Sequence, residues 1–314
     1  MKQFKRSSGN PLYIRAFALI FLALLVFLGV YIIFTVRGQK NQETEELLKL
    51  WNDGLFRDAY ELSNERLTGE PLNYDNLVIN GFAAYQLGEA QITNASKQEY
   101  FDDAIWSLRK ALLQNPPWGR EKETAQIYYC LGKAYYRKGI GYEDLTIQYF
   151  EKAETAGLNA DDLYEFLGLA YAATGDYRSS VAAFTKLLNQ YESDDNAPSD
   201  LLLLAIARSY SALEQYASAK AYLIRCIDTS RDDITKLEAR LFLAELMQKS
   251  GDTTRAELQY QTILAENGDN AEAYFQLGEI YNAQGDTVKA RAEWRKAIRT
   301  DPTHPTARER LGLR

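Results

Sequence analysis

The sequence predicts an all-α solenoid, in which a short pair of helices is repeated along the chain. The main observation is a pattern of small, turn-forming and aromatic residues that recurs at a fixed spacing. The aligned positions are Leu277, Gly285, Asp286, Ala290 and Trp294 in residues 271–304, and Leu243, Gly251, Asp252, Ala256 and Tyr260 in residues 237–270. A fixed period of this kind indicates a stacked array of units rather than one closed core.

This pattern resembles the tetratricopeptide repeat (TPR) family, whose units of about 34 residues each fold as helix A, a turn and helix B. The resemblance implies a protein-binding surface. Seven units can be placed, at residues 40–73, 74–118, 125–160, 161–194, 200–233, 237–270 and 271–304. The second unit is 11 residues longer than the common length and the third is two longer. We expect both insertions between helix A and helix B, where a repeat array accepts extra residues.

Three kinds of residue explain why each unit folds as a helix pair. Small residues let the axes of helices A and B approach, glycines close helix A in a left-handed conformation, and aromatic side chains fill the space between helices. The small positions are Gly81, Gly132, Gly168, Ala207, Ala244 and Gly278 on helix A, and Ala59, Ala104, Ala219, Ala256 and Ala290 on helix B. The closing glycines are Gly54, Gly88, Gly139, Gly175, Gly251 and Gly285.

The array is predicted to end in a capping helix over residues 305–314. This segment has Leu311 and Gly312 in the positions expected for the start of another helix A, but its other residues are mostly polar or charged. A polar terminal helix shields the last hydrophobic face of a solenoid from water.

A run of 21 uncharged residues, Ala16–Val36, precedes the array. At about 1.5 Å per residue it would span roughly 30 Å, which is the thickness of the hydrocarbon core of a bilayer. A cleaved signal peptide is the alternative, but the run exceeds the usual apolar length of about 7–15 residues and no A-x-A site follows it. We therefore predict an uncleaved transmembrane signal anchor.

The charges that flank this run predict its orientation. Residues 1–15 carry four basic residues and no acidic one, whereas Arg37 and Lys40 are followed closely by three glutamates. The positive-inside rule therefore favours a cytoplasmic tail over residues 1–15 and an array on the far side of the membrane. The compact design without long tails suggests a bacterial source, so we expect a single-pass protein of the inner membrane with a periplasmic array.

The array itself is acidic. From residue 40 onward the chain holds 31 basic and 43 acidic residues, which gives a net charge of −12. Nucleic-acid binding needs a basic surface, so no nucleic-acid partner is expected. The same charge disfavours an array that lies flat on anionic lipid, and residues 16–36 are the expected contact with the bilayer.

The sequence offers no catalytic motif, so the protein is not expected to be an enzyme. The only histidine is His304, and the two cysteines, Cys130 and Cys226, lie two repeats apart and are predicted to be buried and unpaired. Neither a nucleophile elbow nor a phosphate-binding loop is present. No cofactor, metal ion or small-molecule substrate is therefore expected.

The resemblance implies that partners bind on the concave face, which the A helices line. We predict that the outward residues of these helices form a peptide-binding groove, with an aromatic and basic middle and an acidic C-terminal part. The candidate residues are Phe82, Tyr85, Tyr129, Lys133, Tyr136, Arg137, Leu169, Leu204, Arg208, Leu241 and Phe275. Tyr129, Lys133, Tyr136, Arg137 and Arg208 are expected to contact an acidic or aromatic segment, since tyrosine and arginine are enriched at binding hot spots. A solvated helix face that binds nothing is the alternative.

The insertion of the second repeat, Glu89–Glu99, is expected to form a decorated turn, or else a lip over the groove. It is the longest departure from the common repeat length.

These observations favour a membrane-anchored interaction scaffold in a bacterial envelope complex. Secretion, outer-membrane assembly, cytochrome maturation, pilus and periplasmic flagellar machinery all remain open as settings. A translocon-associated holdase chaperone that binds extended segments is the second hypothesis, and an enzyme is a remote third.

Overall fold

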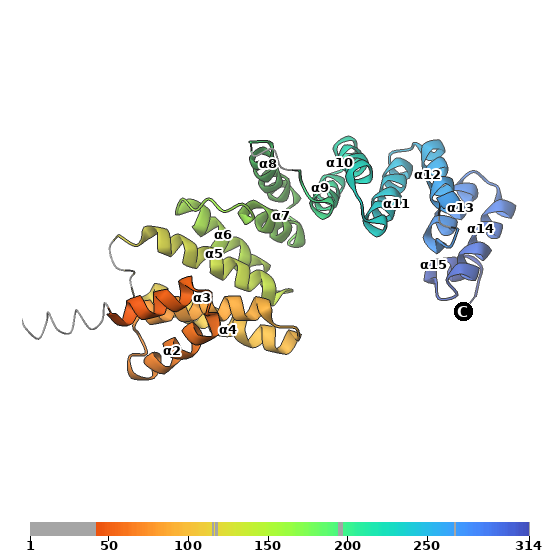
Figure 1. Ribbon diagram of the computed structural model, residues 1–314. Helices are drawn as coiled ribbons and strands as arrows, with labels where there is room; N and C mark the ends of the chain where they lie inside the picture. Colours follow the sequence, from red (N-terminus) through yellow and green to blue (C-terminus); the bar gives the residue numbers. More distant parts are fainter. Residues whose placement is uncertain (1–41, 115, 117–118, 194–196, 267, 314) are drawn as a thin grey trace, which may run out of the picture. The chain divides into compact units, whose positions relative to one another are not determined.

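The computed structural model describes residues 42–114, 116, 119–193, 197–266 and 268–313, and these residues form α-helices joined by short turns, with no strand among them. The chain divides into two compact units, one ending at Lys138 and the other beginning at Gly139. We call them the N-terminal unit and the C-terminal unit. Figure 1 shows the helices along the chain. The predicted all-α repeat architecture is therefore confirmed for the described part.

The N-terminal unit contains the first repeat, the second repeat and helix A of the third. Residues 42–52 are helical, and the helices that follow are α2 (Phe56–Gly69), α3 (Tyr74–Ala90), α4 (Asn94–Leu113) and α5 (Glu121–Lys138). Leu47, Ala59, Ile79 and Ala83 are buried together, so residues 42–52 pack with α2 and α3. Each helix buries one face against its neighbours in sequence, as a stacked array requires.

A buried polar network joins α2, α3 and α4. The side-chain amide of Asn80 donates to Ser63 Oγ at 3.0 Å and to Asn64 Oδ1 at 3.0 Å. Its carbonyl oxygen accepts from Ser107 Oγ at 2.7 Å. Asn80, Ser63 and Ser107 are all buried. Because both ends of the amide are satisfied, the network fixes how the three helices pack without leaving a buried polar group unpaired.

The insertion of the second repeat forms neither a decorated turn nor a lip. Its residues extend the two helices, so that α3 has 17 residues and α4 has 20, and the turn between them is only Gln91–Thr93. Thr93 caps α4, since its hydroxyl accepts from the amide of Ser96 at 3.3 Å. The prediction of a decorated turn or a lip was wrong because most of the residues in this stretch are Glu, Ala, Gln and Lys, which are good helix formers.

The C-terminal unit continues the regular pattern of helix pairs. Its helices are α6 (Glu143–Thr155), α7 (Leu163–Ala173), α8 (Tyr177–Ser193), α9 (Asp200–Ala212), α10 (Tyr216–Thr229), α11 (Asp233–Lys249), α12 (Thr253–Glu266), α13 (Ala271–Ala283), α14 (Thr287–Thr300) and α15 (Pro305–Arg310). In the alternation of the repeat, α7, α9, α11 and α13 are A helices and α8, α10, α12 and α14 are B helices.

The core of this unit is a series of overlapping clusters rather than one centre. Leu204, Leu223 and Leu243 belong to one cluster, so α9, α10 and α11 pack together. Ala244, Tyr260 and Leu277 belong to the next, which joins α11, α12 and α13. Each A helix thus contributes to two successive clusters, which is how a solenoid propagates.

Glycine on helix A allows the close approach of helix B at several repeats. A Cβ atom on Gly168 would lie 2.4 Å from a ring carbon of Phe184, and one on Gly278 would lie 2.4 Å from the ring of Trp294. These separations are too short for any real Cβ contact. The small-residue positions of the repeat therefore have the packing role that the sequence predicts.

In two repeats the turn after helix A has no glycine in the left-handed conformation. Gly54, Gly139, Gly175, Gly251 and Gly285 all have positive φ angles, between 73° and 84°. Gly88 was wrongly assigned to this group, because the extended α3 continues past it and its Cα faces the ring of Phe101. In the fifth repeat Glu214 has the left-handed conformation, with φ of 59°.

The C-terminal helix α15 caps the last repeat, as predicted, although it spans only Pro305–Arg310. His304 is buried and lies at its start. Its Nδ1 accepts from the amide of Ala307 at 3.2 Å, and its Nε2 lies 3.3 Å from a carboxylate oxygen of Glu272. Since Nδ1 is an acceptor, Nε2 carries the proton in this arrangement, and the histidine has a structural role.

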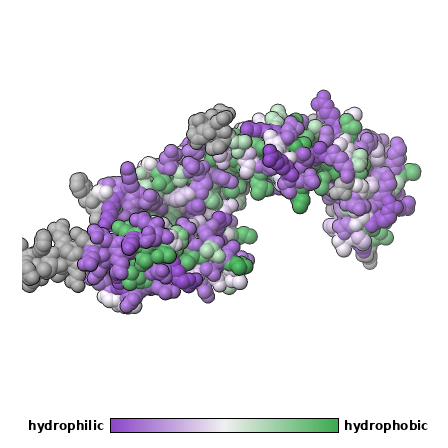
Figure 2. All heavy atoms as spheres, viewed as in Figure 1, coloured by the Kyte–Doolittle hydropathy of each residue, from purple (hydrophilic) through white to green (hydrophobic). Residues whose placement is uncertain are grey.

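The predicted transmembrane segment, residues 16–36, lies outside the described residues, as does the tail before it. Within the part of the chain that the structure covers, no helix combines the length and the apolar character that crossing a bilayer requires. On the face drawn in Figure 2, hydrophilic residues cover most of both units and hydrophobic residues appear in smaller patches. Such a surface is typical of repeats that face water.

Candidate functional site

Among the pockets of the described residues, one in each unit takes its walls from several A helices. The N-terminal pocket is lined by Trp51, Phe82, Tyr85, Gln86, Gln126, Tyr129, Cys130 and Lys133, and has a volume of about 260 Å³. The C-terminal pocket is lined by Arg208, Glu238, Leu241, Phe242, Glu245, Tyr260, Glu272 and Gln276, and has a volume of about 340 Å³. Each pocket draws its walls from the A helices of three successive repeats, and Tyr260 of the B helix α12 completes the second.

Four of the eight residues that line the N-terminal pocket are aromatic. Trp51 comes from the helical residues 42–52, Phe82 and Tyr85 from α3, and Tyr129 from α5. The Trp51 and Phe82 ring centroids are 5.9 Å apart in a tilted arrangement. Aromatic side chains offer a large contact area with little conformational freedom to lose, so this wall suits an apolar or aromatic side chain of a ligand.

Lys133 is the charged residue among the eight that line this pocket. Its Nζ lies 5.3 Å from the ring centroid of Tyr129 and 5.9 Å from that of Tyr85, and 3.5 Å from the hydroxyl of Tyr129. The two rings therefore hold the ammonium group by cation–π contacts. The lining carries a single positive charge on an aromatic surface.

Burial controls the chemistry of the other polar groups in the N-terminal pocket. Burial raises the pKa of the Cys130 thiol far above its ordinary value, so the thiol is protonated and is a poor nucleophile. Burial also raises the pKa of Tyr85, whose hydroxyl is buried. Both side chains form part of the pocket wall and supply no nucleophile at neutral pH.

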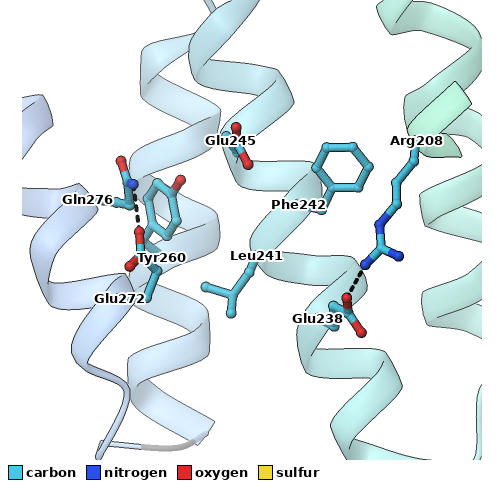
Figure 3. A pocket seen from close by; sticks show the side chains of 8 residues that line it. All are labelled: Arg208, Glu238, Leu241, Phe242, Glu245, Tyr260, Glu272 and Gln276. Atoms are coloured by element: carbon cyan, nitrogen blue, oxygen red, sulfur yellow. Dashed lines mark hydrogen bonds and ion pairs between the residues drawn. The ribbon is translucent and has the colours of Figure 1, made fainter. Parts of the chain in front are cut away.

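Carboxylates surround the C-terminal pocket. Figure 3 shows Glu238, Leu241 and Glu245 on α11, with Leu241 directed toward the helices that carry Tyr260 and Glu272. These residues lie on α11, α12 and α13, so the repeat itself brings them together. Three glutamates and one arginine line the pocket, and the lining is therefore negative.

The charged groups of this pocket have partners on its rim. Arg208 forms an ion pair with Glu238, and Lys249 pairs with Glu245 at 2.6 Å. Glu272 accepts from Gln276 at 2.7 Å and contacts His304. The paired side chains are about half exposed. Exposed pairs of this kind contribute little to stability, and each carboxylate retains further lone pairs for a ligand.

The structure groups some of the predicted groove residues and separates others. Phe82, Tyr85, Tyr129 and Lys133 line the N-terminal pocket, and Arg208 and Leu241 line the C-terminal pocket. Tyr136 is half-buried on α5 and lines neither pocket. The predicted aromatic and basic set is thus divided, with Arg208 in a different unit from the four residues on α5.

Three of the apolar candidates take part in core packing. The expected outward position of Leu204 is wrong, because it is buried among α9, α10 and α11. Phe275 is also buried, and its ring packs on His304 at 5.1 Å between centroids. Leu169 is partly buried against a cluster that includes Phe184 and Leu202. Helical periodicity placed these residues on the outward face, but the face buried between neighbouring helices is wider than the prediction allowed.

Arg137 also differs from its predicted role. Its guanidinium group binds Glu89 at both carboxylate oxygens, at 2.8 and 2.9 Å. This two-point ion pair joins α5 to the end of α3, which exists in this position because the insertion extends α3. An acidic ligand would have to compete with Glu89 for the same donors.

The prediction missed Trp51, Gln86, Phe242, Tyr260 and Gln276 as pocket residues. Tyr260 was missed because the repeat pattern aligns it with Trp294, a core position, and its ring is indeed buried. Trp51 was missed because the first repeat follows the pattern least closely. Both aromatic residues pack beside residues that were predicted to line the groove. Trp51 lies beside Phe82, and Tyr260 lies beside Leu241.

No group of side chains within the described ranges has the composition and spacing to hold a metal ion. Cys130 and Cys226 are free and buried. The paired aspartates at 232–233 belong to a helix start, where Asp232 caps α11 through the amide of Thr235 at 2.8 Å.

The architecture and the pockets define an α-solenoid of the kind that binds other proteins. Family comparison then identifies the repeats: models described as tetratricopeptide repeat match residues 161–194, 202–233 and 241–305. The chain therefore carries tetratricopeptide repeats, and the first matched range coincides with a predicted repeat. Such repeats are typically non-catalytic modules for protein–protein interaction.

Solved structures share this fold. The C-terminal part of a TPR repeat-containing protein from Cytophaga hutchinsonii is 17% identical, with a TM-score of 0.59 over 85% of this chain and 99% of the other. The structure of Naa15/Naa10 bound to HypK-THB is 14% identical, with a TM-score of 0.52 over 87% of this chain and 39% of the other. No curated protein matches the chain. At these identities the likeness concerns the fold alone.

Proposed function

We propose that this protein is a membrane-anchored scaffold of the bacterial envelope, and that its N-terminal pocket binds an extended segment of a partner protein. The observation that carries the proposal is the position of the pocket. Its walls come from the A helices of three successive repeats, so a bound segment would be held by the repeat array itself. The protein is proposed to act by binding, without catalysis.

The lining of the N-terminal pocket indicates the chemistry of the segment. Trp51, Phe82 and Tyr129 offer aromatic surface for an apolar or aromatic side chain. Lys133 offers a cation that two rings hold in place. The partner segment should therefore carry an apolar or aromatic residue next to a carboxylate. The side chains of Gln86 and Gln126 can form hydrogen bonds with its backbone.

The membrane anchor in this proposal rests on residues 16–36 and on the basic residues before them. The scaffold would stand close to the bilayer, because only a few residues separate Val36 from the helical residues 42–52. We infer an inner-membrane protein with a cytoplasmic N-terminus and a periplasmic array. A fusion of a compartment-specific reporter to Arg314 tests this topology, and activity of the reporter in the cytoplasm alone would overturn it.

The test of the binding function is photocrosslinking in living cells, with the photoreactive residue at Gln126. This residue lines the pocket and is exposed, so the probe should not disturb packing. The matched control is the same probe at Ile92, which is 95% exposed in the turn between α3 and α4. The Lys133→Glu variant, carrying the probe at Gln126, reverses the charge in the pocket.

A dominant partner at Gln126 is expected, absent at Ile92 and strongly reduced by Lys133→Glu. Mass spectrometry of the product then names the partner. Many unrelated unfolded proteins at low yield would instead indicate a holdase chaperone. Equal products at both positions, or none at Gln126, would show that this pocket is not the binding surface.

A further inference from the structure

We propose that the C-terminal pocket binds an arginine side chain in a basic segment of a partner protein. This proposal rests on the proposed function, because it assumes that the A helices are the binding surface. It assigns the second pocket a ligand opposite in charge to that of the first. The site comprises Glu238, Glu245, Glu272, Tyr260, Leu241 and Phe242.

The first argument is charge complementarity. Glu238 and Glu245 are two turns apart on α11, and Glu272 comes from α13, so carboxylates face the pocket from two helices. Arg208, Lys249 and His304 each contact one of these carboxylates, but the three glutamate side chains remain about half exposed. A guanidinium group has five N–H donors in a plane and can bind several carboxylate oxygens at once.

The second argument is the position of Tyr260, a buried side chain whose hydroxyl lies at the pocket wall. Tyr260 is 1% exposed, and its ring packs in the core between α11, α12 and α13. Figure 3 shows its hydroxyl group directed toward the side of the pocket that carries Glu245. A hydroxyl oxygen at the pocket wall can accept a hydrogen bond from the N–H groups of a guanidinium ligand.

The electrostatic potential at the Tyr260 hydroxyl also favours a positively charged ligand. Burial raises the pKa of its hydroxyl, and the nearby carboxylates of Glu245 and Glu272 raise it further. The hydroxyl therefore stays protonated and experiences a negative potential. A cation placed in the pocket would reduce the repulsion among these groups, whereas an anion would increase it.

The apolar walls favour arginine over a simple metal ion or a small cation. Leu241 and Phe242 line the pocket beside the carboxylates, and together they can cover the aliphatic stem of a long side chain. The flat guanidinium group also stacks on aromatic rings. A volume of about 340 Å³ is large for one ion and lies within the range of side-chain and small-ligand pockets, roughly 300–1,000 Å³.

The experiment is selection from a randomised peptide library on the full-length protein, followed by affinity measurement of the enriched peptides. We expect arginine to be enriched at one position. Replacing that arginine by glutamine, or testing the protein variant Glu238→Gln/Glu245→Gln, should weaken binding roughly tenfold or more. High salt should weaken it as well, because screening shortens the range of charge attraction from about 10 Å at 0.1 M to about 3 Å at 1 M.

A charge-matched control variant separates the effect of the pocket carboxylates on binding from the effect of the net charge of the array. Asp228→Asn/Glu309→Gln removes two exposed carboxylates on α10 and α15, neither of which lines the pocket. It should bind the enriched peptides as the wild type does. Tyr260→Phe removes only the hydroxyl at the pocket wall, so it should change thermal stability little and weaken binding roughly threefold.

The outcomes also separate this proposal from the proposed function. If crosslinking at Gln126 finds a partner but the library yields no basic peptides, the arginine site is disproved and the scaffold function stands. If basic peptides bind equally to the wild type and to Glu238→Gln/Glu245→Gln, the attraction is non-specific and the site is again disproved. If neither pocket yields a ligand, both proposals fail.

Discussion

The two pockets are built in the same way and have opposite chemistry. Each takes its walls from the A helices of three successive repeats, yet the N-terminal pocket combines aromatic rings with a lysine, and the C-terminal pocket combines glutamates with Leu241 and Phe242. The residues that define the repeat therefore determine where a surface forms. The residues between them determine what that surface can bind.

The cores of the two units differ in a comparable way. The N-terminal unit buries an amide network centred on Asn80, which joins three helices. The C-terminal unit instead has a buried hydroxyl pair, in which Ser180 Oγ lies 2.9 Å from Ser209 Oγ. Elsewhere its helices approach through glycine–aromatic contacts such as Gly168 with Phe184. The N-terminal unit shares such contacts, as between Gly88 and Phe101, and adds the satisfied amide network to them.

The largest expected effect is the loss of the amide network. Asn80→Ala removes the partner of Ser107 and leaves a cavity beside buried polar groups, so we expect the N-terminal unit to lose roughly 3 kcal/mol of stability. Ser209→Ala in the C-terminal unit removes one hydroxyl of a pair and should cost only about 1 kcal/mol. Chemical denaturation with hydrogen exchange, resolved by mass spectrometry, assigns each loss to its helices.

If Asn80→Ala and Ser209→Ala lowered stability by the same amount, the proposed difference between the two cores would be wrong. Asn80→Asp provides a further check, since it keeps the shape of the side chain but replaces the donating amide with a carboxylate. It should be no more stable than Asn80→Ala, because a buried charge is added among hydroxyl groups. Recovery of wild-type stability in Asn80→Asp would contradict the role assigned to the network.

The second effect concerns the glycine positions on helix A. Gly168→Ala places a Cβ 2.4 Å from the Phe184 ring, and Gly81→Ala places one 2.5 Å from Leu108 Cγ. We expect a loss of about 2 kcal/mol for Gly168→Ala and about 1 kcal/mol for Gly81→Ala, because a leucine can change rotamer more easily than a buried ring can move. Thermal unfolding measures both.

Gly69→Ala is the matched control for these substitutions. Gly69 is the last residue of α2, and no atom lies within 4 Å of the place where its Cβ would be. Alanine there should be neutral or slightly stabilising, since it has the higher helix propensity. If Gly168→Ala behaved like Gly69→Ala, the glycine–aromatic contact would not determine helix spacing.

The fold was predictable because the repeat is a local pattern. The small residues, the turn glycines and the helix caps each act within a few residues, so a single sequence is enough to find them. The extension of α3 and α4 was missed because the repeat spacing shows only how many residues are inserted. Whether those residues form a loop or lengthen the helices depends on their helix propensity, and residues 89–99 lengthen the helices.

The pockets were less predictable, because they depend on packing between repeats. Phe82, Tyr129 and Lys133 were found from helical periodicity, and the structure places them together. Leu204 was assigned to the surface although three helices bury it, and Arg137 was assigned to a ligand although Glu89 already binds it. A periodicity gives the direction of a side chain on its own helix, but it does not give the neighbours that cover or pair with it.

The third effect is a stabilising one, and it concerns a turn in the C-terminal unit. Glu214 has a φ of 59°, whereas glycine occupies the left-handed position after α7, α11 and α13. Glu214→Gly should raise stability by about 1 kcal/mol, because glycine has no Cβ to strain in this conformation. Gly175→Ala, at the same position in the preceding repeat, should lower it by a similar amount. A loss of stability in Glu214→Gly would show that its side chain, and not the backbone, decides the turn.

The smallest effect is a pH dependence that both units should share. Tyr60 donates to Asp103 at 2.5 Å in the N-terminal unit, and Tyr171 donates to Glu151 at 2.6 Å in the C-terminal unit. Burial and the hydrogen bond to Asp103 raise the pKa of Tyr60 to about 12, and burial and Glu151 raise that of Tyr171 as well. A tyrosine whose pKa is raised on folding stabilises the fold fully below its unfolded value near 10.

This stabilisation is lost as the pH rises from about 10 through the folded pKa, because the unfolded chain then releases the proton first. Tyr60→Phe should therefore lose less stability than the wild type between pH 9 and pH 11. Since the ring is partly solvated, screening reduces the difference to roughly 0.5 kcal/mol. Tyr171→Phe should behave in the same way. Thermal unfolding at each pH measures the difference, and parallel curves for wild type and variant would show that the tyrosine–carboxylate contact does not couple to folding in that unit.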